Sequence, residues 1–202
     1  MNPEKEKWIL LALLSLIWGS SFILIKKSLD HFNPYEVGAL RVLIAGLVLL
    51  PVAIKNIRKF PKKNVKWLIL AAITGNFIPM FLFPIAETEV SSSIAGIINS
   101  MMPIFVIIVG ALLWKFETTK RQIIGVLISF SGACILAFSG GEGGEFKLIP
   151  ILLLLLATLL YAISTTTVKS KLSDIPAKIL SAFVFSFVLI FPSLIALVFA
   201  GF

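Results

Sequence analysis

Seven long apolar stretches, separated by short breaks that carry Lys and Arg, constrain this chain more than any other feature. A helix that crosses a hydrocarbon core of about 30 Å needs about 20 mainly apolar residues, and each stretch approaches that length. The sequence therefore predicts an all-α membrane protein, a multi-helix bundle with about seven transmembrane helices. The expected spans are Trp8–Ile25, Val37–Ile54, Val65–Ile85, Ser91–Trp114, Ile123–Ser139, Leu148–Val168 and Ile179–Phe202, the fifth being the shortest.

Composition supports lipid as the solvent of this chain. Hydrophobic residues make up 58% of the sequence and charged residues only 14%, and the mean hydropathy is +1.04. A soluble domain carries nearly twice that charge, so a water-soluble fold is excluded. The net charge of +8 does not indicate nucleic-acid binding, because the basic residues lie in the breaks between apolar runs. Cys134 is the only cysteine, so no disulfide within the chain is expected.

The distribution of Lys and Arg predicts the orientation in the membrane. If the N-terminus is cytoplasmic, the outer loops hold only Lys26, Lys27 and Lys147, and Arg41 lies within the second span. All the other basic residues then lie in inner segments, as the positive-inside rule requires. We therefore expect a multi-pass protein of the cell (plasma or inner) membrane whose N-terminus is cytoplasmic.

An internal repeat is visible in the sequence. The segment LLSLIWGSSFILIKK, which starts at Leu13, matches LLATLLYAISTTTVK, which starts at Leu155; with a gap of a residue or two, Trp18 falls on Tyr161 and Ser21 on Ser164. Five expected spans lie within one period, and an odd number makes the second copy enter the membrane from the opposite side. We therefore predict one five-helix repeat over residues 1–147 and a partial, inverted second repeat of two helices over 148–202. Chance alignment of Leu-rich segments is the alternative.

The order of several short motifs resembles the EamA-like branch of the drug/metabolite transporter superfamily. These motifs are Trp18-Gly19-Ser20-Ser21-Phe22, then Lys26, Pro34, Arg41 and Ala45, a small-residue fourth span that contains Pro103, then Glu117 and Gly125 to Gly132. The resemblance implies ten helices in two inverted five-helix halves. It also implies movement of amino acids, nucleotide sugars or other small metabolites and drugs, often outward. We therefore expect this chain to be part of a longer, ten-helix protein.

The sequence does not provide the residues of an enzyme. Paired mid-span acids, a His cluster or a Ser beside a base are the usual groups for catalysis inside a membrane, and none is present. His31 is the only histidine, and it is expected in a solvated outer loop. The glycines of residues 140–144 lack the Lys and helix start of a phosphate loop. We therefore expect no catalytic residue, no metal and no cofactor.

Polar and aromatic residues that recur at helical spacing within the spans predict one face of a substrate cavity. Mid-span polar groups are costly in lipid and are expected to face a cavity or a partner helix. The candidates are Trp18, Ser21, Phe22, Asn76, Met80, Phe83, Asn99, Met102, Tyr161 and Thr165. For the small residues Gly19, Gly96 and Ser164, close helix packing is an equally good explanation.

Four charged residues are expected at the outer ends of the first three spans: Lys26, Arg41, Glu87 and Glu89. Our hypothesis is that Arg41 pairs with Glu87 or Glu89 as an outer gate, or contacts a substrate carboxylate. Snorkelling or a static ion pair explains the pattern as well. No carboxylate is expected in the middle of the membrane, so a proton-coupling acid is not predicted in these helices.

These observations favour a secondary transporter of small metabolites or drugs, in particular an exporter of amino-acid-like solutes that works by alternating access. A non-transporting membrane scaffold or assembly subunit is the main alternative, and a membrane-embedded enzyme is the weaker one. The expected partners are the lipid bilayer and a small-molecule substrate, without nucleic acid. The sequence leaves the oligomeric state open.

Overall fold

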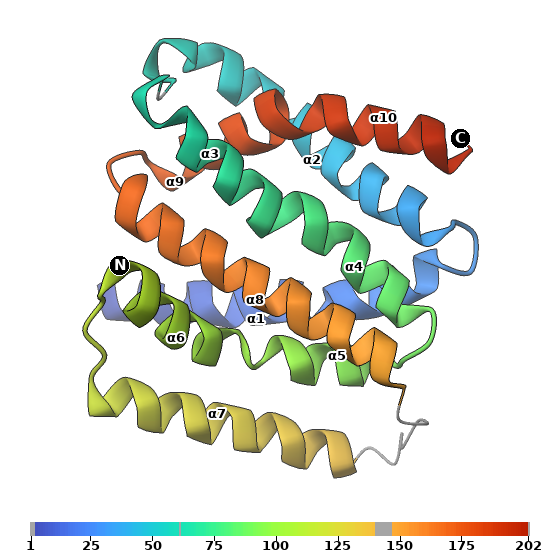
Figure 1. Ribbon diagram of the computed structural model, residues 1–202, viewed down its shortest axis with the longest axis vertical. Helices are drawn as coiled ribbons and strands as arrows, with labels where there is room; N and C mark the ends of the chain where they lie inside the picture. Colours follow the sequence, from blue (N-terminus) through green and yellow to red (C-terminus); the bar gives the residue numbers. More distant parts are fainter. Residues whose placement is uncertain (1–2, 61, 140–146, 202) are drawn as a thin grey trace.

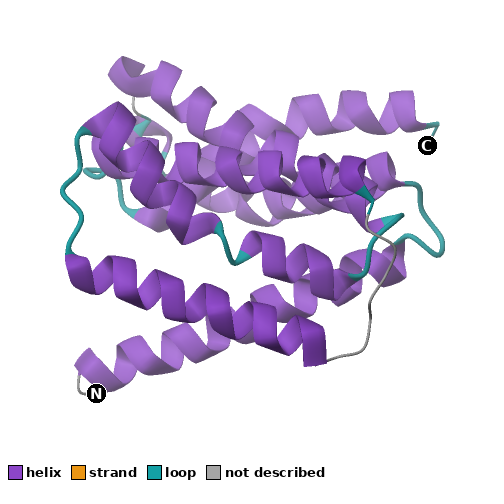
Figure 2. Ribbon diagram, turned by 60° about the horizontal axis from the view of Figure 1, so that its bottom comes forward, coloured by secondary structure: helices purple, strands orange, loops and turns teal. Residues whose placement is uncertain are grey.

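The computed structural model describes residues 3–60, 62–139 and 147–201, and these form helices and connecting loops without a strand (Figure 1; Figure 2). The α-helices are α1 (Pro3–Ser28), α2 (Pro34–Lys55), α3 (Val65–Ala72), α4 (Ile78–Glu87), α5 (Ser92–Asn99), α6 (Met102–Trp114), α7 (Lys120–Ser139), α8 (Leu148–Lys171), α9 (Ala177–Ala182) and α10 (Ile190–Ala200). Two short 3₁₀ turns, η1 (Ile57–Lys59) and η2 (Lys62–Asn64), connect α2 to α3. Two π-helical turns, η3 (Ile73–Phe77) and η4 (Phe183–Leu189), lie within longer helical segments.

Six helical segments in the described part are long and apolar enough to cross a membrane. They are Glu4–Ser28, Pro34–Lys55, Lys62–Glu87, Ser92–Trp114, Leu148–Lys171 and Ala177–Ala200. Each corresponds to one of the expected spans, which confirms an all-helical membrane bundle. The fifth expected span, Ile123–Ser139, forms most of the 20-residue helix α7. It is not among the six, and the side chains of 136–139 lie outside the description.

Asn33 explains where α2 begins. Its side chain accepts hydrogen bonds from the backbone N–H groups of Tyr35 and Glu36, and the Glu36 carboxylate accepts one from the Asn33 N–H. This reciprocal capping box satisfies N–H groups that have no partner within the helix. The Asn33 amide also donates to the carbonyl of Ala200 at 3.2 Å, which ties the start of α2 to the end of α10.

Three of the spans are interrupted rather than continuous α-helices. The π turn η3 separates α3 from α4, with Pro79 in the first turn of α4, and the π turn η4 separates α9 from α10. The expected continuous span Ser91–Trp114 is instead two helices, because the chain breaks after Asn99, just before Pro103. Proline lacks an N–H and clashes with the preceding turn, and π turns are common at functional positions in helices.

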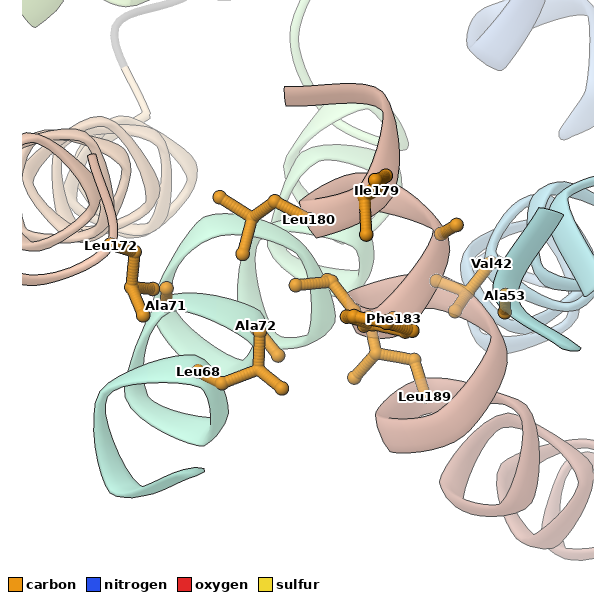
Figure 3. Packing of buried hydrophobic residues seen from close by; sticks show 12 residues of the cluster. Val42, Ala53, Leu68, Ala71, Ala72, Leu172, Ile179, Leu180, Phe183 and Leu189 are labelled. Atoms are coloured by element: carbon orange, nitrogen blue, oxygen red, sulfur yellow. The ribbon is translucent and has the colours of Figure 1, made fainter. Parts of the chain in front are cut away.

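Helix α8 lies at the centre of the bundle, against α3, η3, α4, α5 and α6 (Figure 1). One apolar core, called here the outer core, is made by Ile25, Val37, Phe83, Ala86, Val90, Ala95, Ile98, Leu154 and Ala157. A second, called here the inner core, surrounds Phe183 with residues of α2, α3 and α9 that include Val42, Leu68, Ala72 and Leu180 (Figure 3). The two cores hold α8 and η4 against the first three spans.

The surface of the bundle is apolar, as lipid contact requires. In α1 the large side chains Trp8, Leu16 and Ile17 are exposed, and Leu112 and Val198 are exposed on α6 and α10. In a soluble protein such a surface would cause aggregation, whereas hydrocarbon tails solvate it at no cost.

Gly46 allows the closest approach between α2 and η4. A Cβ atom at this position would lie 2.6 Å from the Ile190 side chain and 2.7 Å from the Phe185 carbonyl oxygen. The Ser186 hydroxyl donates to the Gly46 carbonyl at 2.8 Å across the same contact. A side chain on Gly46 would therefore separate the two segments.

We expect Gly46→Leu to destabilise the protein by roughly 1–3 kcal/mol, the usual range for overpacking a core. Gly125→Leu is the matched control, because a Cβ on exposed Gly125 meets nothing within 4 Å. Thermal unfolding in detergent, followed by size-exclusion chromatography of the heated samples, measures the melting temperatures of the two variants. Equal melting temperatures for the two variants would contradict the packing described here.

Candidate functional site

The candidate site is a cavity of about 330 Å³ among α1, α2, η3, α4, α5, α6 and α8. The residues that line it are Trp18, Ser21, Phe22, Ile25, Arg41, Gly75, Asn76, Phe83, Asn99, Met102, Tyr161, Ser164 and Thr165. Trp18 and Thr165 are exposed, whereas Phe83 and Ser164 are buried, so the cavity runs from an open edge into the bundle. A volume of this order accommodates a small metabolite.

Arg41 is the only charged residue among those that line the cavity. Its Nη2 donates to the Ser21 hydroxyl at 3.3 Å, and no carboxylate in the described part of the chain lies within ion-pair distance of it. A guanidinium has five N–H donors in a planar fork that suits a carboxylate. Arg41 therefore presents to whatever enters the cavity a half-buried positive charge that no carboxylate of the described residues contacts directly.

Aromatic rings form one wall of the cavity. The ring centroids of Phe22 and Phe83 lie 5.6 Å apart, and those of Phe83 and Tyr161 lie 5.9 Å apart in a stacked arrangement. The three residues come from α1, α4 and α8, so the wall joins helices that are distant in sequence. Such a surface holds an apolar or cationic group by contact with ring faces.

The interrupted helices supply the two amide side chains of the cavity. Asn76 lies within the π turn η3, and Asn99 is the last residue of α5, directly before the break. The Ser164 hydroxyl donates to the Ala71 carbonyl at 2.9 Å, and a Cβ on Gly75 would lie 2.1 Å from the Ser164 oxygen. Gly75 therefore allows α8 to lie directly against the π turn.

The structure brings together all the predicted lining residues except Met80. Met80 packs instead against the inner core and is not among the residues that line the cavity. Helices α2 and α4 approach closely here, since a Cβ on Gly38 would lie 2.8 Å from the Met80 carbonyl.

Ile25, Gly75 and Ser164 line the cavity but were not assigned to it from the sequence. Ile25 lies three residues after Phe22, and helical spacing alone does not distinguish it from Lys26. Ser164 was considered and was judged equally compatible with packing. Its contact with Gly75 and its place in the lining show that it does both.

The predicted outer gate is not formed as an Arg41–carboxylate ion pair. Glu89 lies 3.4 Å from Lys147 instead, and Lys26 donates to the backbone carbonyls of Glu87 and Val90. Carbonyls at the end of a helix lack partners and carry partial negative charge, which explains why Lys26 binds there. Of the four charged candidates, only Arg41 reaches the cavity.

A polytopic helical bundle with a polar and aromatic cavity beside interrupted helices is typical of the class of membrane transport proteins. Residues 6–138 match the model of the EamA-like transporter family, and the chain belongs to this family. No solved structure matches the chain.

The relatives of this chain are transporters by name. An uncharacterized transporter of Archaeoglobus fulgidus is 30% identical over 173 residues, which cover 83% of this chain and 59% of the relative. The uncharacterized transporter YvbV of Bacillus subtilis is 26% identical over 83% of this chain and 55% of its own length. A probable terminal-alkyne amino-acid exporter of Streptantibioticus cattleyicolor is 25% identical over 70% of this chain and 48% of its own length. The chain thus spans about half the length of the curated relatives it matches.

We expect the cavity to contain water, and cysteine accessibility tests this. In a Cys134→Ala background, Asn99→Cys should react with a small water-soluble thiosulfonate at least about tenfold faster than Leu112→Cys, because only a hydrated thiol ionises. Leu112 lies in the same span and is 77% exposed on the lipid side. Similar rates at the two positions would mean that the cavity is not hydrated.

Proposed function

We propose that the protein is a secondary transporter of small metabolites, which exports amino-acid-like solutes by alternating access. The observation that carries the proposal is Arg41, a single cation without a direct ion pair among the described residues, in a cavity that also has amide, hydroxyl and aromatic groups. A cavity of this kind suits a small solute with a carboxylate at one end and an apolar part at the other.

Each part of such a solute has a complementary group. The carboxylate is expected to contact Arg41 and Ser21, since charge-assisted bonds to a guanidinium are the strongest available here. The α-ammonium group is expected between the amide oxygens of Asn76 and Asn99 and the face of Tyr161. The apolar side chain of the solute then lies against Phe22 and Phe83. The name of the Streptantibioticus relative, a probable amino-acid exporter, supports the same class of solute.

Alternating access rests on the predicted inverted repeat. Under this proposal the five-helix repeat of residues 1–147 and the second repeat that begins at 148 move relative to each other around the cavity. Helix α8 is the first helix of the second repeat and contacts α3 to α6 of the first repeat. A relative movement of the helices at this interface would therefore alter access to Arg41.

The proposed location is the cell membrane with a cytoplasmic N-terminus. Besides the bias of basic residues, cations and indole rings gather at the proposed inner end. Lys171 lies over the rings of both Trp67 and Trp114, at 5.6 and 5.2 Å. Trp and Lys side chains with this arrangement favour the membrane–water interface.

Replacement of Arg41 tests the proposed solute class. We expect radiolabelled L-phenylalanine, L-leucine or L-threonine to bind the purified complete gene product and to undergo counterflow in proteoliposomes. Arg41→Gln should weaken binding roughly 10- to 100-fold, the value of a charge-assisted hydrogen bond. The corresponding amino-acid amides, which lack the carboxylate, should bind wild type and Arg41→Gln equally.

Lys27→Gln is the matched control, because Lys27 is an exposed cation near the outer end of α1 and does not line the cavity. Its binding and counterflow should equal those of wild type. The absence of counterflow for every amino acid tested would contradict an amino-acid transporter. Equal losses for amino acids and amides would contradict the role of Arg41.

A further inference from the structure

Glu87 is a fully buried acid beside the cavity, and none of the roles described so far uses its side chain. It ends α4 and is 0% exposed. Its Oε2 accepts a hydrogen bond from the Ser92 hydroxyl at 3.1 Å. Its Oε1 is buried and has no hydrogen-bond partner among the described residues. A buried, ionised carboxylate normally has an ion pair or several hydrogen bonds, so this arrangement needs an explanation.

The hydrogen bonds of Ser92 suit either protonation state of Glu87. The Ser92 oxygen lies 3.1 Å from Glu87 Oε2 and 3.2 Å from the carbonyl oxygen of Phe22, and its single proton can serve only one of them at a time. When Glu87 is ionised, Ser92 donates to the carboxylate. When Glu87 is protonated, its O–H can donate to Ser92, which then donates to Phe22. The gain or loss of one proton by Glu87 thus reverses the direction of the hydrogen bonds that join α4, α5 and α1.

Two cations interact electrostatically with Glu87 without pairing with it. They are Lys26 on α1 and Arg41 on α2. Lys26 is held by the carbonyls of Glu87 and Val90, and Arg41 by Ser21. Among the described residues, no side-chain nitrogen of Lys26 or Arg41 lies within ion-pair distance of the Glu87 carboxylate. The charge of Glu87 therefore changes the electric potential at Arg41 without removing Arg41 from the cavity.

Several other ionisable groups near this end of the bundle interact with groups other than Glu87. Lys147, which precedes α8, pairs with Glu89. Glu36 on α2 completes the capping box of Asn33. Tyr161 on α8 interacts with Arg41 across the cavity. From α5 the polar group that reaches Glu87 is the Ser92 hydroxyl. Lys26 and Arg41 thus remain as the charges that Glu87 influences.

We propose that Glu87 is a proton-binding site linked to the anion site at Arg41. Ionised Glu87 offsets the positive potential of Arg41 and weakens its attraction for a solute carboxylate. Protonation of Glu87 removes that negative charge and raises the affinity of the cavity for a solute carboxylate. By linkage, a bound carboxylate raises the affinity of Glu87 for its proton by the same factor. The linkage rests on the proposed function, because it assumes that a carboxylate solute enters the cavity. The proton site itself does not depend on transport.

Infrared difference spectroscopy of the complete gene product between acid and neutral pH tests the proton site without any solute. We expect a C=O stretching band of a buried, protonated carboxyl group that is absent in Glu87→Gln and retained in Glu89→Gln. Ser92→Ala should change the pH at which the band appears, which tests the site even if Glu87→Gln does not fold. A spectrum of Glu87→Gln identical to that of wild type would overturn the proposal.

The linkage to Arg41 is tested in the same spectra. Arg41→Gln should change the pH at which the Glu87 band appears, whereas Lys147→Gln should not, because Lys147 pairs with Glu89. An unchanged band in Arg41→Gln would overturn the linkage and leave the proton site standing.

Solute binding gives a second measure of the linkage. Affinity for the L-amino acid with the strongest counterflow should rise as the pH falls, by at most about tenfold per pH unit for one linked proton. Glu87→Gln should show high affinity at every pH. The same pH dependence in wild type and Glu87→Gln would overturn the linkage. If no amino acid binds wild type, the proposed function fails, while the infrared bands still decide the proton site.

Discussion

The rest of the structure depends on how backbone polar groups are satisfied where helices are interrupted inside the membrane. Hydrocarbon offers no hydrogen bonds, so a break in a helix is tolerated only where protein covers it or where it borders a cavity. The π turn η3 and the break between α5 and α6 both lie against α8. Ser164 of α8 donates to the Ala71 carbonyl beside η3, and Gly75 permits the contact. Helix α8 therefore packs against both irregular segments and satisfies a carbonyl beside η3.

The same breaks create the cavity. Asn76 lies in a π turn and Asn99 precedes a break, so their amides are placed where the regular helix surface is lost. Phe22, Phe83 and Tyr161 close one side by ring contacts, and Arg41 provides the charge. Irregular backbone and polar side chains thus occur together, because each is costly in lipid and both are accommodated by the same interior space.

Much of this arrangement could be predicted from sequence, because helical periodicity and the cost of polar groups in lipid operate within single spans. Periodicity alone placed Trp18 and Phe22 on one face. It did not separate Met80, which packs against the inner core, from the residues that line the cavity. It also gave no sign of the π turns, which depend on tertiary packing. The burial of Glu87 also depends on tertiary packing. The sequence predicts an exposed residue at the end of a span, whereas in the structure α1 and α5 cover Glu87.

Lys26 and Arg41, the two cations near the cavity, have different roles because their charged groups differ in shape and hydration. Lys26 has a compact ammonium group on a flexible chain, and it binds the carbonyls of Glu87 and Val90 at the end of α4. A guanidinium is weakly hydrated, planar and permanently charged, and it remains charged when half-buried. Arg41 uses one donor on Ser21, which leaves the others of its fork free to face the cavity. An Arg at this position thus keeps a fixed charge beside Glu87, and the proton on Glu87 becomes the variable that sets the field inside the cavity.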